Sequence, residues 1–141
     1  MYTVDLTGKI ALIFGVANHR SIAWAIAQAL YSAGAKVALT YQTDRLKESV
    51  EGLAKEIGDA PLFQCDVSND GEVEALYKKV GETMGTLSTV VHSIAFANRE
   101  DLGGAFYDTS RGGFNTALEV SATHLFPSHG TRRLSWGTAV A

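Results

Sequence analysis

Residues 9–27, "KIALIFGVANHRSIAWAIA", decide the fold of this chain. The run from Lys9 to Gly15 is short, apolar and closed by a glycine, which is typical of a strand buried on both faces of a sheet. From Ser21 onward the spacing of apolar residues is that of an amphipathic helix, with Gly34 as a stop signal. The apolar positions of that helix are Ile22, Ile26, Leu30 and Ala33. The stretch therefore predicts a strand, a loop and a helix in succession.

The same alternation continues along the chain. Further strands are predicted at 36–41 and 61–67, and 87–97 is predicted as a fourth strand that runs into a loop. The helices between them have apolar faces formed by Leu46, Val50, Leu53 and Ile57, and by Val73, Leu76, Val80 and Met84. A polar, glycine-containing stretch, 98–113, leads to the beginning of another helix at 114–122. About four strands alternating with helices imply right-handed crossovers and a parallel, doubly wound α/β sheet of the Rossmann-like class.

Composition limits the classes of function. A chain of 141 residues, 46% hydrophobic and 19% charged, fits one globular domain, and a net charge of -3 argues against a protein that grips nucleic acid by neutralising phosphates. The single cysteine, Cys65, has no partner for an internal disulfide and is expected to be a small buried thiol. Asp5 precedes every basic residue, and no apolar stretch approaches the length of a membrane span. We therefore expect neither a signal peptide nor a membrane-spanning segment at the amino terminus. We expect a cytoplasmic protein.

In doubly wound sheets, ligands bind at the carboxyl ends of the strands, so the residues that follow each strand are the candidate site. After the first strand, Gly15 is the only glycine of the loop, and Ala25 stands where a third glycine would pack the helix on the strand. Gly15 permits a tight turn, while Ser21 and the amide of Ile22 open a helix whose positive end would face a pyrophosphate. Ser21 is equally well explained as a simple N-cap.

The next two strand ends carry polar groups. Gln42 stands near the usual ribose-binding position and can bond a ribose hydroxyl or the adenosine edge, although an exposed glutamine is also ordinary surface. Asp66 can accept a hydrogen bond from an adenine amino group, and Val67 can pack on the ring. The alternative for Asp66 is a cap on the following helix.

At the end of the fourth strand, small residues between His92 and Ala97 would let a nicotinamide ribose approach the backbone. Ile94 could cover the nicotinamide ring. We interpret His92 as a partly buried structural histidine rather than a catalytic one.

Together, "GVANHRSIAWAIA", "TYQTDRL", "QCDVSND" and "VVHSIAFA" resemble the NADH-dependent enoyl-acyl-carrier-protein reductases of bacterial fatty-acid synthesis, a divergent branch of the short-chain dehydrogenases. The resemblance covers about residues 6–122, and G-x5-S-I-A is the family's form of the cofactor loop. It implies that Gly15, Ser21 and Ile22 hold the pyrophosphate, Gln42 lies by the adenosine ribose, Asp66 and Val67 bind adenine, Ile94 contacts the nicotinamide and Ala97 lines the acyl pocket.

The resemblance also implies the cofactor, substrate and assembly. Members that prefer NADPH tend to place basic residues directly after the tyrosine of the second strand; Gln42 and Thr43 are not basic, so NADH is expected. The family reduces trans-2-enoyl thioesters on acyl carrier protein, and its intact members are expected to be homotetramers. Its catalytic tyrosine and lysine follow a fifth strand, and no catalytic residue can be assigned here. Tyr2 and Lys9 match the Y-x6-K spacing by chance.

The pattern breaks after Ala122. The family continues with something like Tyr-Ser-Leu inside a long helix, whereas this chain places Pro127 there, and a base lost near codon 123 would explain the change. We expect an incomplete NAD-binding domain at 1–122, an out-of-frame tail at 123–141, no activity of the chain alone and an exposed, aggregation-prone edge on the fourth strand. We expect no metal site at His124 and His129 and no nucleic-acid patch at Arg132, Arg133 and Trp136.

Two other functions stay open. One is a non-catalytic NAD-binding fragment. The other is a short-chain reductase that acts on a ketone, against which "HSIAFA" argues because ordinary members carry an Asn-Asn-Ala-Gly-like segment there.

Overall fold

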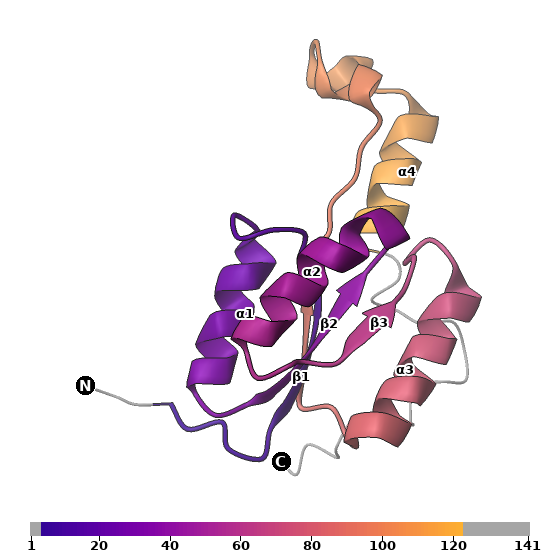
Figure 1. Ribbon diagram of the computed structural model, residues 1–141. Helices are drawn as coiled ribbons and strands as arrows, with labels where there is room; N and C mark the ends of the chain where they lie inside the picture. Colours follow the sequence, from indigo (N-terminus) through magenta and orange to yellow (C-terminus); the bar gives the residue numbers. More distant parts are fainter. Residues whose placement is uncertain (1–3, 123–141) are drawn as a thin grey trace.

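A parallel sheet of four strands forms the centre of the molecule in a computed structural model that describes residues 4–122 (Figure 1). The strands are β1 (Ile10–Phe14), β2 (Lys36–Tyr41), β3 (Leu62–Gln64) and β4 (Thr89–His92), in the order β3-β2-β1-β4. All three pairs are parallel, with Leu12 of β1 opposite Ala38 and Val90. Every residue of β1 is buried, as the uninterrupted apolar run predicts. The predicted Rossmann-like α/β fold class is confirmed.

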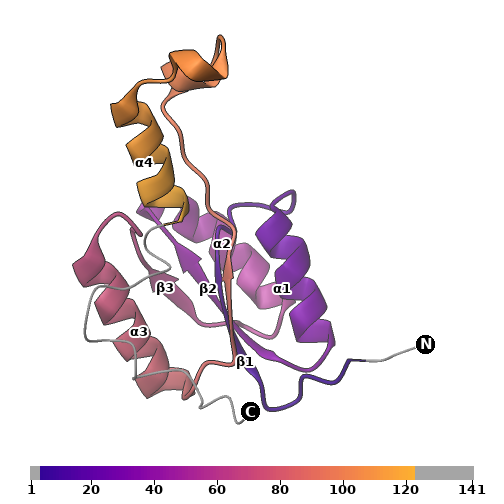
Figure 2. The same ribbon diagram turned by 180° about the vertical axis from the view of Figure 1, so that it is seen from behind.

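Helices cover both faces of this sheet (Figure 2). α1 (Ile22–Ser32) and α2 (Asp44–Glu56) pack on one face, where Ile13 and Leu39 point into a shared apolar cluster with Trp24 and Val50. α3 (Asp70–Met84) covers the other face and buries Val73, Leu76 and Val80 against Leu12, Phe14 and Phe63. The apolar faces predicted for α2 and α3 are the faces that these helices bury.

The buried face of α1 differs from the predicted one. Ile22 is 74% exposed, whereas Ala23, Trp24 and Ala27 are buried. Ile22 is the first residue of the helix, and the large Trp24 side chain takes the position against the sheet. Because adjacent helical residues project about 100° apart, burying Trp24 and Ala23 turns Ile22 outward.

The third and fourth strands are shorter than 61–67 and 87–97. β3 pairs with β2 at three positions, from Leu62 to Gln64, and β4 ends at His92. The residues beyond these ends leave the sheet as loops at its carboxyl edge. Those loops, rather than longer strands, surround the site described below.

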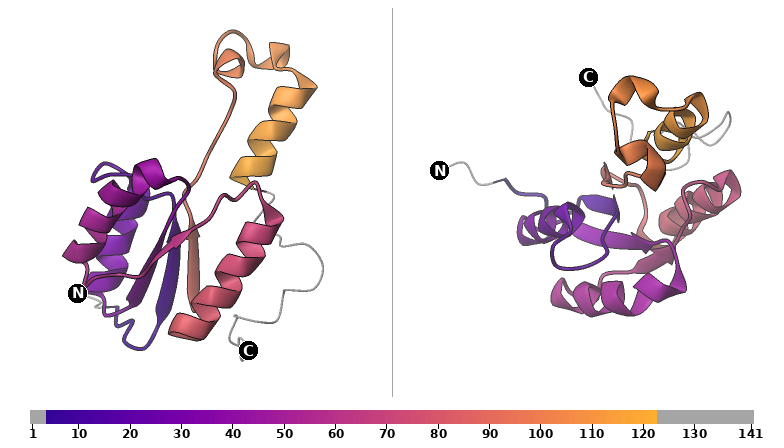
Figure 3. Two further views of the ribbon diagram at one scale, coloured as in Figure 1. Left: turned by 45° about the vertical axis from the view of Figure 1, so that its right-hand side comes forward. Right: turned by 90° about the horizontal axis from the view of Figure 1, so that it is seen from above.

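The segment after β4 extends away from the sheet and α4 (Arg111–Ser121) returns toward it (Figure 3). Two 3₁₀ helices, η1 (Arg99–Leu102) and η2 (Phe106–Asp108), lie on the outward part. α4 begins earlier than predicted because the Ser110 hydroxyl accepts a hydrogen bond from the amide of Gly113 at 2.9 Å.

Within residues 4–122, β4 pairs with β1 alone, so its outer edge has no neighbouring strand in this part of the chain. The expected aggregation at that edge stays a prediction. No helix in the same range is both long and apolar enough to cross a bilayer. The sequence expectations about Tyr2 and about the tail at 123–141, with its proline, histidines and basic pair, lie outside the described residues.

Candidate functional site

A pocket of about 450 Å³ opens at the carboxyl edge of the sheet, which is within the size range of small-molecule and cofactor sites. Segments that follow all four strands contribute to its wall. Five of the residues selected from the sequence lie there: Gly15, Gln42, Asp66, Val67 and Ile94. The lining also includes residues that the sequence analysis did not select: Val16, Ala17, Thr40, Tyr41, Leu46, Cys65, Ser68, Ser93, Ala95, Phe96 and Val120.

The end of β1 meets the end of β4 at Gly15. Gly15 has a φ of +97°, and a Cβ atom built on it would overlap the backbone carbonyl of Ser93. The amide of Ser93 in turn donates to the carbonyl oxygen of Phe14 at 3.2 Å. A residue with a side chain fits neither the backbone angle nor the space, so glycine is required at this turn.

Ser21 organises the loop before α1 through its hydroxyl. Its Oγ accepts hydrogen bonds from the amides of Ala17 at 3.0 Å and Asn18 at 3.1 Å, and it makes no side-chain capping bond to the helix. The simple N-cap explanation of Ser21 is therefore wrong for the hydroxyl, although the residue occupies the N-cap position. With both acceptor positions used, the hydroxyl proton can be donated to an anion. Ser21 and Ile22 are not among the residues that line the pocket.

Asp66 and Gln42 face the pocket from neighbouring strand ends. The hydroxyl and amide of Ser68 donate to Oδ1 of Asp66 at 2.7 and 3.0 Å. These bonds, with a smaller contribution from the Gln42 side chain, hold the pKa of Asp66 below its ordinary value. Asp66 is thus an ionised acceptor at the pocket wall at neutral pH.

The helix cap at this end belongs to Asn69, not to Asp66. Oδ1 of Asn69 accepts from the amides of Gly71 at 3.0 Å and Glu72 at 3.3 Å. Glu72 reaches back, and its Oε2 accepts from the amide of Asp66 at 2.8 Å. The capping alternative for Asp66 is therefore wrong. An Asn followed three residues later by Glu is a capping-box signal that could have revealed both residues.

Cys65 is 3% exposed and forms part of the pocket wall. Burial, followed by the nearby charges of Glu72 and Asp66, raises the pKa of its thiol to about 12. The expectation of a small buried thiol is confirmed. Among residues 4–122, no group of three or more His, Cys, Asp or Glu side chains is placed to hold a metal ion.

His92 links β4 to the end of α4. Its Nε2 lies 2.7 Å from the carbonyl oxygen of Ser121, and its ring meets the Phe14 ring edge-on with centroids 6.5 Å apart. The side chain is half-buried, as the sequence analysis expected. Beyond it, Phe96 lines the pocket, whereas Ala97 lies outside the lining on the way to η1. Val120 reaches the pocket from α4, and no local sequence signal marks it.

The strand order reverses between β1 and β4, and the pocket lies at the carboxyl ends of these strands. This is the arrangement of Rossmann-like α/β proteins, whose ligands bind at such a switch point. A family model described as enoyl-(acyl carrier protein) reductase matches residues 15–129. The chain belongs to that family, as the four strand-end motifs predicted.

Relatives of known name and structure agree with this assignment. The enoyl-[acyl-carrier-protein] reductase [NADH] FabI of Bacillus cereus is 47% identical over 122 residues, which are 85% of this chain and 48% of that protein. The crystal structure of enoyl-[acyl-carrier-protein] reductase (NADH) from Aquifex aeolicus VF5 has a TM-score of 0.81 and 45% identity, covering 85% of this chain and 53% of that one. A Bacillus cereus enoyl-acyl carrier protein reductase structure with NADP+ and indole naphthyridinone also has a TM-score of 0.81, at 46% identity, covering 86% and 48%. The chain spans about half the length of the curated relatives it matches.

Proposed function

We propose that this chain binds NADH in the pocket at the carboxyl edge of the sheet, as the cofactor-binding part of an enoyl-acyl-carrier-protein reductase. The observation that carries the proposal is the meeting of Gly15 with Ser93 at the switch point of the sheet. That meeting brings the ends of β1 and β4 into direct contact, and both Gly15 and Ser93 line the pocket at this edge. An extended anionic ligand can approach the backbone there.

The residues present fit such a cofactor. Gly15, Ser21 and Ile22 are proposed to hold the pyrophosphate, with the Ser21 hydroxyl donating and the start of α1 supplying a positive end. Gln42 is proposed to bond the adenosine ribose. The ionised Asp66 is proposed to accept from the adenine amino group. The adenine ring packs on Val67, which is buried at the wall.

Ile94 is proposed to contact the nicotinamide and Ala97 to lie toward the acyl group. The nicotinamide, when bound, supplies hydride to the β-carbon of a trans-2-enoyl thioester carried by acyl carrier protein. Within residues 4–122, no tyrosine is followed by a lysine at the Y-x6-K spacing of the family. We therefore propose that this chain binds the cofactor without turning over substrate. We also propose a cytoplasmic location for this chain. The homotetramer is proposed for intact members of the family.

Titration of the full 141-residue chain with NADH, followed by nicotinamide fluorescence, tests the binding proposal. Saturable binding that weakens in Gln42→Ala and Asp66→Asn supports it, and absence of binding by the folded wild-type chain refutes it. An assay with NADH and a crotonyl thioester separates the binding fragment from the enzyme. Turnover on the order of 1 per second or faster would contradict the inactive fragment.

A further inference from the structure

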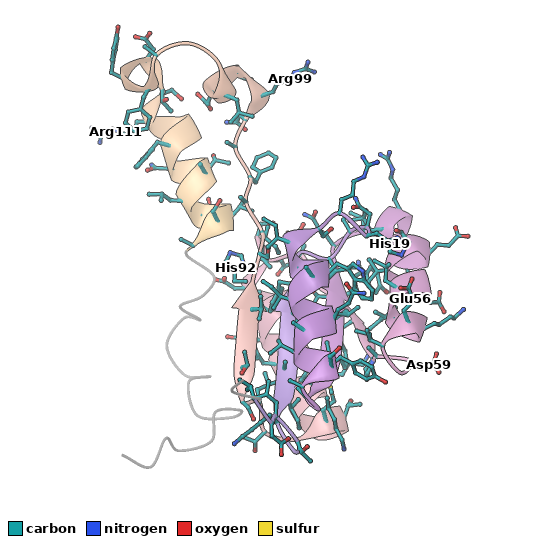
Figure 4. The ribbon with its side chains drawn as sticks, turned by 90° about the vertical axis from the view of Figure 1, so that its left-hand side faces the viewer. His19, Glu56, Asp59, His92, Arg99 and Arg111 are labelled. Atoms are coloured by element: carbon teal, nitrogen blue, oxygen red, sulfur yellow. The ribbon has the colours of Figure 1, made fainter. Side chains whose placement is uncertain are left out.

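Two side chains on α2 hold the loop that joins β1 to α1. The hydroxyl of Ser49 donates to the carbonyl oxygen of Ala17 at 2.8 Å, across 32 residues of sequence. Nε2 of His19 lies 2.9 Å from Oε1 of Glu56. Figure 4 shows His19 on the loop beside Glu56 on α2. Ser49 and Glu56 are two helical turns apart, so they lie on one side of α2.

Both backbone polar groups of Ala17 are hydrogen-bonded to serine side chains. Its amide donates to Oγ of Ser21 at 3.0 Å, and its carbonyl accepts from Oγ of Ser49. Ala17 also lines the pocket. The position of this part of the wall therefore depends on α2 as well as on α1.

The two contacts differ in expected strength. The His19 and Glu56 side chains are 70% and 47% exposed, and exposed ion pairs contribute little. The bond from Ser49 to the Ala17 carbonyl is exposed as well, but it is short and restrains the backbone directly. His19 is additionally oriented by the Trp24 ring of α1, which it meets at 86° with centroids 6.2 Å apart.

We propose that Ser49 is a positioning residue for the pyrophosphate-binding loop, with Glu56 as a weaker second anchor. α2 directly follows β2, whose end carries Gln42, so one helix fixes the spacing between the loop and the proposed ribose position. Loss of the Ser49 bond loosens Ala17 and Asn18 and weakens binding of the phosphate-bearing part of the ligand. The inference rests on the proposed NADH site.

The test uses Ser49→Ala in the full chain, with residue-resolved amide exchange and ligand titration as readouts. We expect faster exchange at the amides of Ala17 and Asn18 and a rise of about 3- to 10-fold in the Kd for NADH, the range for one lost hydrogen bond. The Kd for adenosine, which carries no phosphate, should stay within about twofold. Ser49→Thr keeps a hydroxyl, so the amide exchange and the Kd for NADH should stay close to their wild-type values.

Matched variants distinguish loss of the hydrogen bond from Ser49 to Ala17, here called the tether, from general effects on the helices. Glu56→Ala should raise the Kd for NADH by no more than about threefold, as expected for an exposed pair. Ser32→Ala on α1 and Glu51→Ala on α2 make the same chemical deletions at exposed positions away from the loop contacts and should change neither readout.

Unchanged exchange and unchanged NADH affinity in Ser49→Ala would overturn the inference. Equal losses of NADH and adenosine affinity together with a lower unfolding midpoint would also overturn it, because they indicate a merely structural role. Faster loop exchange in a chain whose wild-type form binds no NADH would support the tether and refute the proposed cofactor site.

Discussion

Gly15 lies so close to the carbonyl oxygen of Ser93 that no side chain fits between the ends of β1 and β4. The contact joins the first cofactor-loop residue to the start of the segment that carries Ile94. Both strands end at the switch point of the sheet, so a change at this one position affects the fold and the proposed NADH site together.

Gly15→Ala should therefore destabilise the chain and abolish NADH binding. The positive φ and the overlap with the Ser93 backbone together should lower the free energy of unfolding by at least about 2 kcal/mol. Urea denaturation measures the change. Gly52→Ala is the control: Gly52 lies within α2 with open space around it, so alanine there should raise stability by about 0.5 to 1 kcal/mol. Equal effects of the two variants would contradict the steric argument.

Asn69→Ala should remove the cap of α3. Two amide bonds to Oδ1 are lost, and the expected cost is about 1 kcal/mol of unfolding free energy. Thr43→Ala is the matched comparison, because Thr43 occupies the N-cap position of α2 without a side-chain capping bond. Thermal or urea unfolding should show a clearly smaller loss for Thr43→Ala than for Asn69→Ala; the reverse order would refute the capping assignment.

The carboxylate of Asp66 should titrate below about 3.9, the ordinary value for aspartate. A pKa depressed in the folded state contributes stability above the unfolded value, and this contribution is lost as pH falls through the folded pKa. The stability difference between wild type and Asp66→Asn should thus be constant from about pH 8 to about pH 5 and shrink below about pH 4. Carboxyl-carbon NMR measures the titration directly. Ser68→Ala should move the midpoint upward, since Ser68 makes the main contribution.

Cys65 should be unreactive in the folded chain. Its thiol, with a pKa raised to about 12, forms almost no thiolate near neutral pH. Reaction with a disulfide reagent at about pH 8 should be at least about 100-fold slower in the folded chain than in denaturant. Because the folded pKa is raised, this group's contribution to stability is complete below about pH 8.5 and declines as pH rises toward the folded value. Rapid labelling of the native chain would contradict the buried placement.

Cofactor preference should follow the residues after Tyr41. Gln42 and Thr43 offer no positive charge to a 2′-phosphate, so NADH should bind more tightly than NADPH. Thr43→Arg should narrow or reverse that preference, with Thr43→Gln as the uncharged control of similar reach. Paired Kd measurements for the two cofactors decide the point, and a wild-type chain that prefers NADPH would refute the expectation.

Local patterns predicted the elements more completely than their buried faces. Val50 and Leu53 in α2, and Val73 and Leu76 in α3, are buried as their helical spacing predicts. In α1 the spacing selected Ile22, yet Trp24 is buried instead, because a short helix with apolar residues on several sides is oriented by the sheet against which it packs.

The candidate site was partly predictable for a related reason. Carboxyl ends of parallel strands meet at one edge, so the sequence alone places Gln42, Asp66 and Ile94 together. The residues that hold the backbone around these site residues, Glu72 and Ser49, were not predicted. Glu72, which holds the Asp66 amide, had a readable capping signal, whereas Ser49 looked like an ordinary exposed helix residue.

The sequence by itself determined the alternation of strands and helices, the class of the fold, the family and the residues that follow each strand. It could do so because strand and helix periods and turn residues act over short separations. The tertiary structure alone decided that Gly15 meets Ser93, that Ser49 holds Ala17 and that Val120 reaches the pocket. Those contacts join residues that are distant in the chain, and only the packing of helices on the twisted sheet brings them together.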